Sequence, residues 1–136
     1  MAGECPVEDG YVLILHLNLC FKVYNASQRW ISSRNLCRKE NSWLVILDTE
    51  EKHKAVKEYI ETNFDTSRYR IGLGDRKVEG VFLWQNGNNV SFTKWKPGSP
   101  NNDMTTEDCV ILVVSDNWWN DINCAWQHNY ICEHSV

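Results

Sequence analysis

The chain has 136 residues, enough for one compact domain with a sizeable core and too few for two ordinary ones, so we expect a single domain over residues 1–136. Fourteen Lys and Arg against 18 Asp and Glu give a net charge of -4. Because no basic cluster accompanies that balance, the sequence argues against a nucleic-acid partner and against binding to an anionic membrane.

The first apolar run, residues 11–23, has leucine at every second position from Leu13 to Leu19. This period of two is typical of strands with one buried side, and Cys5 before the run with Cys20 near its end could close it into a hairpin, so we expect an N-terminal hairpin. The run is about half the length of a membrane span and is interrupted by polar residues. We therefore expect no membrane insertion within this chain.

Two helices follow in the first half of the chain. Residues 27–40 place Trp30, Ser33 and Cys37 on one narrow face, which predicts a helix with Cys37 turned toward the core. After the apolar run "WLVIL", Asp48 and Glu51 have the spacing of a capping box. A second amphipathic helix is predicted at about 49–63, with apolar residues at helical spacing: Val56, Tyr59, Ile60 and Phe64.

The second half alternates short β-prone runs with turns and acidic segments. The runs are "YRIGL", "VFLW", "VSFTKW", "CVILVV", "NWWN" and "NYICEH". The fold class predicted is α+β, with two helices flanking antiparallel sheets. A long polar excursion from about Asp75 to Asp108 interrupts the strands, and a loop of that length is usually functional or disordered.

Six cysteines occur without a CxxC motif, which favours three disulfides over a thiolate metal site or a redox enzyme. Cysteine number alone permits 15 connectivities. Two glycosylation sequons begin at Asn25 and Asn89. Disulfides and sequons together predict a secreted or extracellular location, including the ectodomain of an anchored protein.

Oxygen-bearing side chains gather in the loops of the second half, in "LGDRKVEG", "SPNND", "EDC" and "WND". Taken alone, an Asn/Asp-rich loop such as "SPNND" is more often a set of turns than an ion site. Together, these segments offer only oxygen ligands, which suits a hard cation. Calcium fits better than magnesium because it accepts about 6 to 8 oxygens in flexible geometry.

In this order, the motifs resemble the C-type lectin domain over nearly the whole chain. The matching elements are Cys37 in the first helix, "YRIGL" in place of the family's Trp-Ile-Gly-Leu strand, Trp95 before a proline loop, "EDC", "WND" and the closing "YICE". The resemblance implies a long-form fold with a calcium-binding loop region. It also implies the disulfide pairs Cys5–Cys20, Cys37–Cys132 and Cys109–Cys124, and a cis peptide bond before Pro100.

The resemblance further implies two calcium sites. The sugar-binding site maps onto Ser99, Asn101, Glu107, Asn120 and Asp121. The structural site maps onto Asp75, Glu79, Asn102, Glu107 and Asp108. Ser99 departs from the family, which has Glu or Gln before the proline, and a hydroxyl is a poorer calcium ligand than a carboxylate.

The function implied is calcium-dependent binding of vicinal sugar hydroxyls on carbohydrates or glycoprotein glycans. Asn101 after the proline leans toward a mannose-type arrangement. Trp118 is an aromatic face that a sugar can stack on, while we assign Trp119 to the core.

Three alternatives stay open. In one, Lys94 or Lys96 replaces an ion by pairing with Glu107. In the second, calcium only orders the loops, or is not needed, and the ligand is another protein. The third concerns assembly, since the sequence leaves open a homodimer. We do not expect an enzyme, because the histidines are scattered and no nucleophile motif accompanies them.

Overall fold

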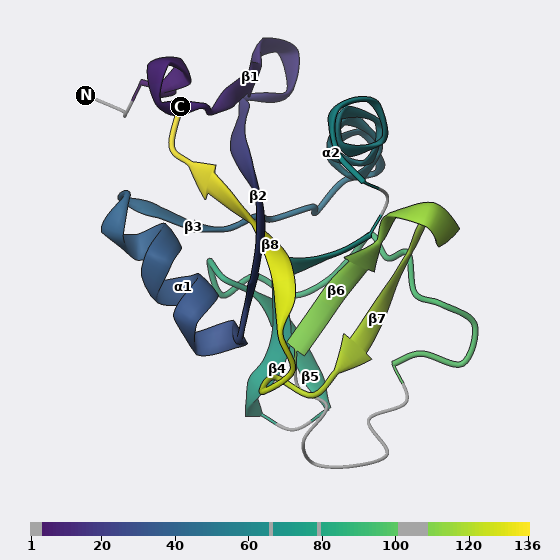
Figure 1. Cartoon of the computed structure of the whole chain (residues 1–136). Helices are drawn as coiled ribbons and strands as arrows, with labels where there is room; N and C mark the ends of the chain where they lie inside the picture. The colour runs from purple at the N-terminus through teal and green to yellow at the C-terminus, as the bar shows by residue number, and fades with distance from the viewer. Residues whose placement is uncertain (1–3, 66, 79, 101–108) are drawn as a thin grey trace.

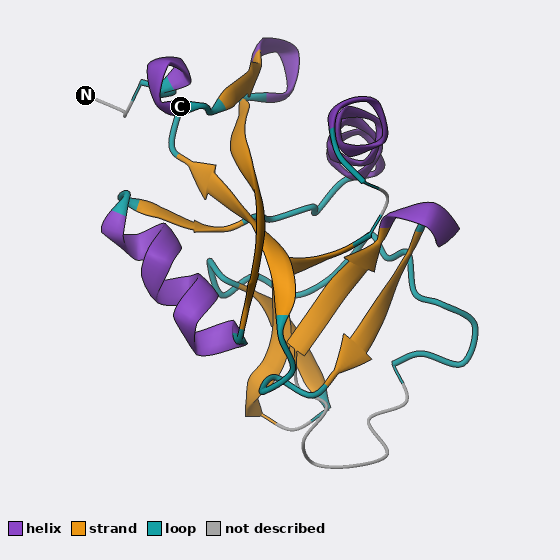
Figure 2. Cartoon of the chain, in the orientation of Figure 1, coloured by secondary structure: helices purple, strands orange, loops and turns teal. Residues whose placement is uncertain are grey.

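A computed structural model of the chain describes residues 4–65, 67–78, 80–100 and 109–136. Two helices, α1 (Trp30–Lys39) and α2 (Glu50–Asn63), lie on either side of a strongly twisted sheet (Figures 1 and 2). The strands are β1 (Val12–Ile14), β2 (Leu19–Gln28), β3 (Ser42–Leu44), β4 (Arg68–Val78), β5 (Val81–Trp84), β6 (Cys109–Val113), β7 (Trp118–Ile122) and β8 (His128–His134). The α+β class is confirmed.

The strands form one hydrogen-bonded sheet in the order β1-β2-β8-β4-β6-β7, with β3 on β8 and β5 on β4. The expectation of purely antiparallel sheets is wrong at one place, because β4 and β8 run parallel, with Tyr69 opposite Asn129 and Arg70 opposite Tyr130. Periodicity in a sequence shows which residues of a strand share a face, but it does not encode the direction of a partner strand.

The N-terminal hairpin is present, with Val12 opposite Phe21 in the β1–β2 ladder. A 3₁₀ turn over Leu15–Leu17 ends at Asn18, whose φ of 49° lies in the left-handed region. This turn replaces the continuous strand that the alternating leucines predict. The Cys5–Cys20 disulfide brings the start of the described chain near the end of β8, because Cys20 lies opposite His134.

Both helices occur where the sequence predicts them. Helix α1 buries Trp30, Ser33 and Cys37, the face inferred from spacing. The cap of α2 differs from the prediction: Thr49 is the N-cap, and its hydroxyl accepts a hydrogen bond from the Lys52 amide at 3.2 Å. Asp48 instead forms an ion pair with Lys52 at 3.2 Å. An Asp and a Thr side by side both satisfy capping rules, so only the backbone path decides between them.

Two predicted strands are shorter than their apolar runs. Strand β3 ends at Leu44, although Val45, Ile46 and Leu47 remain buried beyond it. The run 90–95 forms no named strand and contributes one bridge, from Trp95 to Trp119. The polar excursion also contains an element of its own, strand β5.

Three disulfides join the pairs that the resemblance implies: Cys5–Cys20, Cys37–Cys132 and Cys109–Cys124. The second ties α1 to β8, and the third ties the start of β6 to the turn after β7. Gly72 in β4 has a packing reason to be glycine, because a Cβ there would lie 2.4 Å from the Leu44 carbonyl oxygen. Close packing of β4 on the 44–45 segment therefore depends on this residue.

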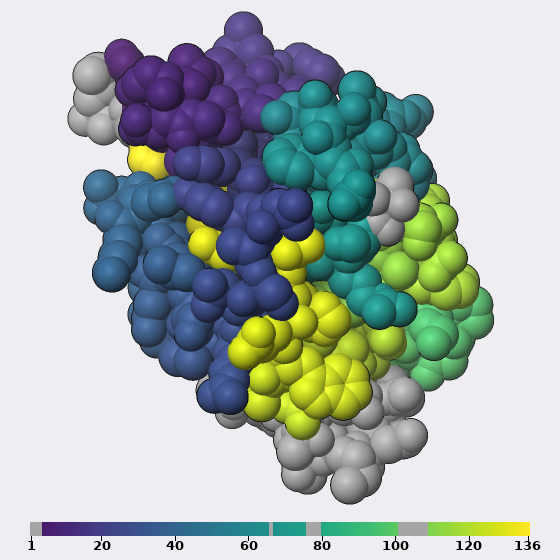
Figure 3. All heavy atoms as spheres, viewed as in Figure 1, coloured from purple at the N-terminus to yellow at the C-terminus, as the bar shows by residue number. Residues whose placement is uncertain are grey.

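The main core lies between α2 and the sheet and includes Trp119, which is fully buried as predicted. The space-filling view shows that atoms from the N-terminal and C-terminal parts of the chain pack side by side on this face of the molecule (Figure 3). No helix among the described residues is long and apolar enough to cross a membrane.

Candidate functional site

Strand β7 carries the "WND" segment and has two distinct faces. Trp119 and Asp121 alternate with Trp118, Asn120 and Ile122 along the strand, so the two sets point to opposite sides of the sheet. Trp119 is fully buried, and Asp121 is 2% exposed. The ladder with β6 is continuous from Trp118 to Ile122, which fixes this register.

The loop before Pro100 is docked along β7. The Trp119 amide donates to the Lys94 carbonyl at 2.7 Å, and the Lys96 amide donates to the Trp119 carbonyl at 2.8 Å. The Ser99–Pro100 peptide bond is cis, as the resemblance implies. The Ser99 hydroxyl then donates to Oδ1 of Asn120 at 2.9 Å. Two predicted site residues, 21 positions apart, are thereby brought into direct contact.

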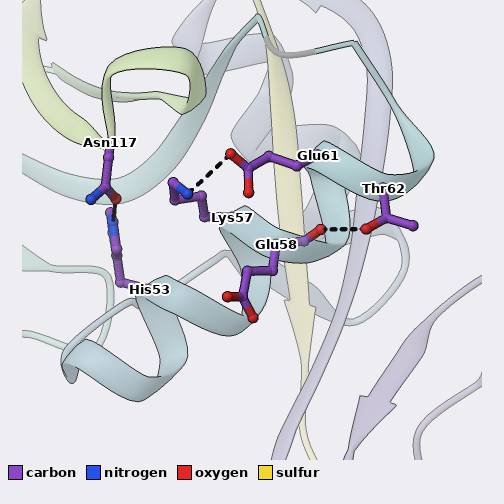
Figure 4. Close-up of polar contacts among 6 residues, drawn as sticks. All are labelled: His53, Lys57, Glu58, Glu61, Thr62 and Asn117. Carbon is purple, nitrogen blue, oxygen red and sulfur yellow. Dashed lines mark hydrogen bonds and ion pairs between the residues drawn. The ribbon is translucent and has the colours of Figure 1, made fainter.

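Trp119 is held from the other side by α2. Its indole Nε1 donates to Nδ1 of His53 at 3.1 Å, so the His53 proton resides on Nε2, which donates to Oδ1 of Asn117 at 2.8 Å. Figure 4 shows His53 and Asn117 facing each other between α2 and the turn before β7. Burial lowers the pKa of His53, which keeps the ring neutral at pH 7. The two hydrogen bonds of neutral His53, from Trp119 and to Asn117, hold in place the strand that carries Asn120 and Asp121.

Three aromatic rings surround Trp119 edge to face. Its ring centroid lies 5.5 Å from that of Trp84, 5.7 Å from Phe92 and 5.8 Å from Trp95. Such pairs add stabilisation beyond the area they bury. The loop that contains Trp95 and strand β7 are therefore packed against the same cluster of aromatic rings.

Asp75, from the predicted structural calcium site, lies on β4 and is 2% exposed. Its Oδ2 accepts a hydrogen bond from the Gly80 amide at 2.9 Å, across the turn between β4 and β5. It therefore approaches the loop region from a different strand than the "WND" residues. The remaining ligands of both predicted calcium sites lie outside the described residues: Glu79, Asn101, Asn102, Glu107 and Asp108.

The described ligands suit a hard cation by chemistry. Ser99, Asn120, Asp121 and Asp75 supply only oxygen ligands, a set typical of calcium. Within the described ranges, no three His, Cys, Asp or Glu side chains form a cluster that could hold a metal ion. A complete calcium shell would therefore need ligands from residues 101–108.

The sequence profile of the Lectin C-type domain matches residues 26–134. The chain belongs to the C-type lectin domain family. It is 29% identical to C-type lectin lectoxin-Lio3 of Erythrolamprus poecilogyrus over 118 residues, covering 84% of this chain and 73% of that protein. It is 32% identical to hepatic lectin of Gallus gallus over 116 residues, covering 84% of this chain and 54% of that protein, so it spans about half of that relative.

Solved structures show the same fold. The cow C-type carbohydrate-recognition domain of CD23, in the presence of GlcNAc2Man3 oligosaccharide, superimposes with a TM-score of 0.85 at 25% identity, covering 98% of this chain and 97% of that one. A calcium-independent type II antifreeze protein superimposes at 0.82 and 24% identity, covering 99% and 96%. The fold alone therefore does not fix a ligand or a need for calcium. As a member of this family, the chain is not an enzyme.

Two residues that matter in this C-type lectin domain escaped sequence analysis. Arg70 directly precedes Ile71, at the place of the motif's tryptophan, and is fully buried. Its Nε donates to the Gln28 carbonyl at 3.1 Å, and its Nη2 donates both to the Cys124 carbonyl at 3.4 Å and to the Trp126 carbonyl. A charged residue inside "YRIGL" gave the only hint, because arginine is almost never fully buried without partners.

The second is Trp126, which follows Cys124 in the turn between β7 and β8 and is 57% exposed. The turn is closed by the Trp126 amide, which donates to the Asn123 carbonyl at 3.1 Å. Trp118 of the same C-type lectin domain is half-buried. The sequons at Asn25 and Asn89 both lie at exposed positions.

Proposed function

We propose that this C-type lectin domain is a calcium-dependent carbohydrate-binding lectin that recognises vicinal hydroxyls, with a lean toward mannose-type sugars. The supporting observation is the contact of Ser99 with Asn120 beside buried Asp121, because it joins the proline loop to the "WND" strand. The lean toward mannose rests on Asn101 and the family resemblance alone. Asn101 and Glu107 complete the proposed set from outside the described part of the chain.

Bound calcium would supply open coordination positions that two neighbouring sugar hydroxyls can fill. The residues of the chain have a different task, which is to satisfy the proton and the lone pairs of each hydroxyl. The Asn120 amide can donate through Nδ2, and the Asp121 carboxylate of the same strand would help to hold calcium. Because His53 and the Trp95 loop hold the strand in place, these groups are oriented before a sugar arrives.

We further propose that Asp75 belongs to a second, structural calcium site together with Glu79, Asn102, Glu107 and Asp108. Its role would be to join the β4–β5 turn to the acidic loop. Calcium would then order the loops and complete the sugar site at once, which is coupling between metal binding and local folding.

Calorimetric titration with calcium, followed by a glycan array with calcium and with chelator, tests the proposal. We expect calcium binding with a dissociation constant of about 10⁻⁴ to 10⁻³ M, and glycan signals that disappear on chelation. Asn120→Ala should abolish glycan binding while the fold persists, and Asp121→Asn should weaken calcium binding with little change of shape. The matched control is Asn88→Ala, at an exposed position on the β5 side of the molecule. No heat and no thermal shift with millimolar calcium would refute the proposal.

One observation favours a second candidate, a protein-binding domain without sugar recognition. Ser99 stands where the family has Glu or Gln. Its hydroxyl donates a hydrogen bond to Oδ1 of Asn120, one of the proposed calcium ligands. If this candidate holds, Asn120→Ala leaves partner binding intact, and Ser99→Glu gives the chain glycan binding that the native sequence lacks. If the native chain binds glycans and Asn120→Ala removes that binding, the result supports the lectin and not the protein-binding domain.

We also propose that the chain is an extracellular glycoprotein. The exposed sequons at Asn25 and Asn89 support this, together with three disulfides. Expression through a secretory pathway should give a protein whose mass falls on deglycosylation, and Asn25→Gln with Asn89→Gln should remove that change.

A further inference from the structure

Helix α1 forms one wall of a cavity of about 370 Å³. Three residues of the helix line it: Trp30, Arg34 and Arg38. They follow one another at intervals of four residues, so they lie on one face of the helix. The Cys37–Cys132 disulfide ties the same helix to β8. This wall of the cavity therefore carries two cationic side chains on a helix that is covalently anchored to the sheet.

The opposite wall is formed by β4, β5 and the turn that follows β5. Leu83 and Gln85 are two residues apart, so they point to the same side of the β5 chain, and both line the cavity. Gly74 lies opposite Leu83 in the β4–β5 ladder and also lines the cavity. Because glycine has no side chain, room is left beside Leu83. The half-buried Leu83 side chain gives this wall an apolar surface.

The charge of the cavity is opposite to that of the whole chain. No Asp or Glu occurs among the described residues of its lining, although the chain has 18 acidic and 14 basic residues. The cavity on the outer face of β6 and β7, which Trp118 and Trp126 line, differs in this respect because it includes Asp116. Two guanidinium groups with no described carboxylate beside them favour an anionic ligand.

Arg34 is held in position on the helix. Its guanidinium carbon lies 5.2 Å from the centroid of the Trp30 ring, which is a cation–π contact. Its Nη2 also donates to Oδ1 of Asn35 at 3.3 Å. A guanidinium presents its N–H groups in a rigid fork that matches the two oxygens of a carboxylate. The orientation of Arg34 is therefore fixed before a ligand arrives.

Arg38 and Gln85 lie at exposed positions on the two walls. Within the part of the chain that the structure describes, Arg38 forms no ion pair, and the Gln85 amide forms no hydrogen bond. The Cγ of Gln85 lies 2.8 Å from the place where a Cβ on Gly72 would be, so the absence of a side chain at Gly72 lets Gln85 lie against β4. Both polar groups can therefore turn toward a ligand.

We propose that the cavity between α1 and the β4–β5 hairpin binds a small organic carboxylate, with Arg34 and Arg38 on the carboxylate and Leu83 beside its apolar part. The inference goes beyond the proposed lectin function, because none of the proposed calcium or sugar ligands lines this cavity. Small-molecule sites span about 300–1,000 Å³, so a cavity of about 370 Å³ suits a ligand with one or two rings.

NMR titration of the full chain with indole-3-acetate tests the proposal, after calcium has been removed on a chelating resin. Indole-3-ethanol has the same ring system without the charge, and acetate has the charge without the ring. We expect indole-3-acetate to bind with a dissociation constant of about 1 mM and to move the Nε–H signal of Arg34 and the methyl signals of Leu83. The other two compounds should bind at least about ten-fold more weakly.

Two variants at exposed positions test the site while the fold persists. Arg38→Gln removes one cation and should weaken binding about five- to ten-fold. Gln85→Glu places a like charge beside the carboxylate at nearly unchanged volume and should weaken binding by a similar factor. The matched control is Lys39→Gln, which removes the same charge from the neighbouring exposed position on α1 outside the cavity lining, and it should change the affinity less than two-fold.

Four results would overturn the carboxylate site. The first is an absence of shifts at Arg34 and Leu83 with about 20 mM indole-3-acetate. The second is equal weakening by Lys39→Gln and Arg38→Gln, which would indicate general attraction to a basic helix. The third is acetate binding as tightly as indole-3-acetate. The fourth is a concentration-dependent dimer that Arg38→Gln abolishes, because a second copy would then occupy the cavity. Since no calcium is present, each of these failures leaves the proposed lectin function untouched.

Discussion

Replacing Arg70 with methionine removes a buried cation while keeping most of the volume of its aliphatic stem. Arg70 is fully buried and joins three carbonyl groups, those of Gln28, Cys124 and Trp126. Burial lowers the pKa of its guanidinium to about 10, so the side chain is charged at pH 7. The charged side chain therefore ties the end of β2 to the turn between β7 and β8.

The expected cost follows from two opposing contributions. Hydrogen bonds to a charged donor contribute about 1.5–3 kcal/mol each, so three contribute about 5–9 kcal/mol. Burying the guanidinium costs several kcal/mol. The difference is about 3 kcal/mol, and at about 3–5 °C per kcal/mol for a chain of this length, Arg70→Met should melt about 10 °C lower.

Urea unfolding followed by tryptophan fluorescence, with disulfides intact at pH 7, measures this difference. Arg38→Met on α1 is the matched control, because Arg38 is exposed, and we expect its effect to stay within about 0.5 kcal/mol. If Arg70→Met unfolds at the same or a higher urea concentration than the native chain, the desolvation of the guanidinium outweighs its hydrogen bonds, and the reasoning is refuted.

Three further predictions concern other polar side chains, buried His53 and Glu133 and exposed Thr49. Burial lowers the pKa of His53, so its contribution to stability is present above about pH 6.5 and lost as the pH falls below that value. His53→Gln should therefore make the free energy of unfolding depend less on pH between pH 7 and 5. An equally steep dependence would contradict a neutral His53 in the folded chain. Burial raises the pKa of Glu133 to about 7, so its contribution is present below about pH 4.5 and lost as the pH rises through 7. Glu133→Gln keeps an acceptor for the Ile46 amide but carries no group that ionises. The free energy of unfolding of the variant, relative to that of the native chain, should therefore rise between pH 5 and pH 8 by up to about 1.4 kcal/mol per pH unit, as urea unfolding at both pH values would measure. Thr49→Ala should cost about 1 kcal/mol in the same assay, whereas no loss would mean that water caps the helix equally well.

Some structural features of particular residues follow from the local sequence pattern, and others do not. Spacing alone identified the buried face of α1, and chain position in the family motif assigned Trp119 to the core. The cap of α2 was misplaced by one residue, because Asp48 and Thr49 satisfy the same local rule. The parallel pairing of β4 with β8 was missed, because it depends on a crossover between segments far apart in the chain.

Some features of the candidate site are likewise predicted by the sequence, and others depend on the fold. The types of residue that suit calcium and sugar are present in the sequence as "SPN" and "WND", and the family motif aligns them. The contact between Ser99 and Asn120 depends on how the Trp95 loop docks along β7. The cavity lined by Trp118 and Trp126 has no pattern in the sequence, because these two residues come from a strand and from a turn whose carbonyl groups bind buried Arg70.

The sequence by itself determined the family, the helices, most strands and the chemistry of the proposed ligands, because periodicity and motif order are properties of neighbouring residues. Tertiary structure alone decided the mixed sheet, the burial of Arg70 and the cavity on the outer face of β6 and β7. The physical reason is that these features arise from strand register and loop docking, which depend on the packing of the whole core rather than on any local stretch of chain.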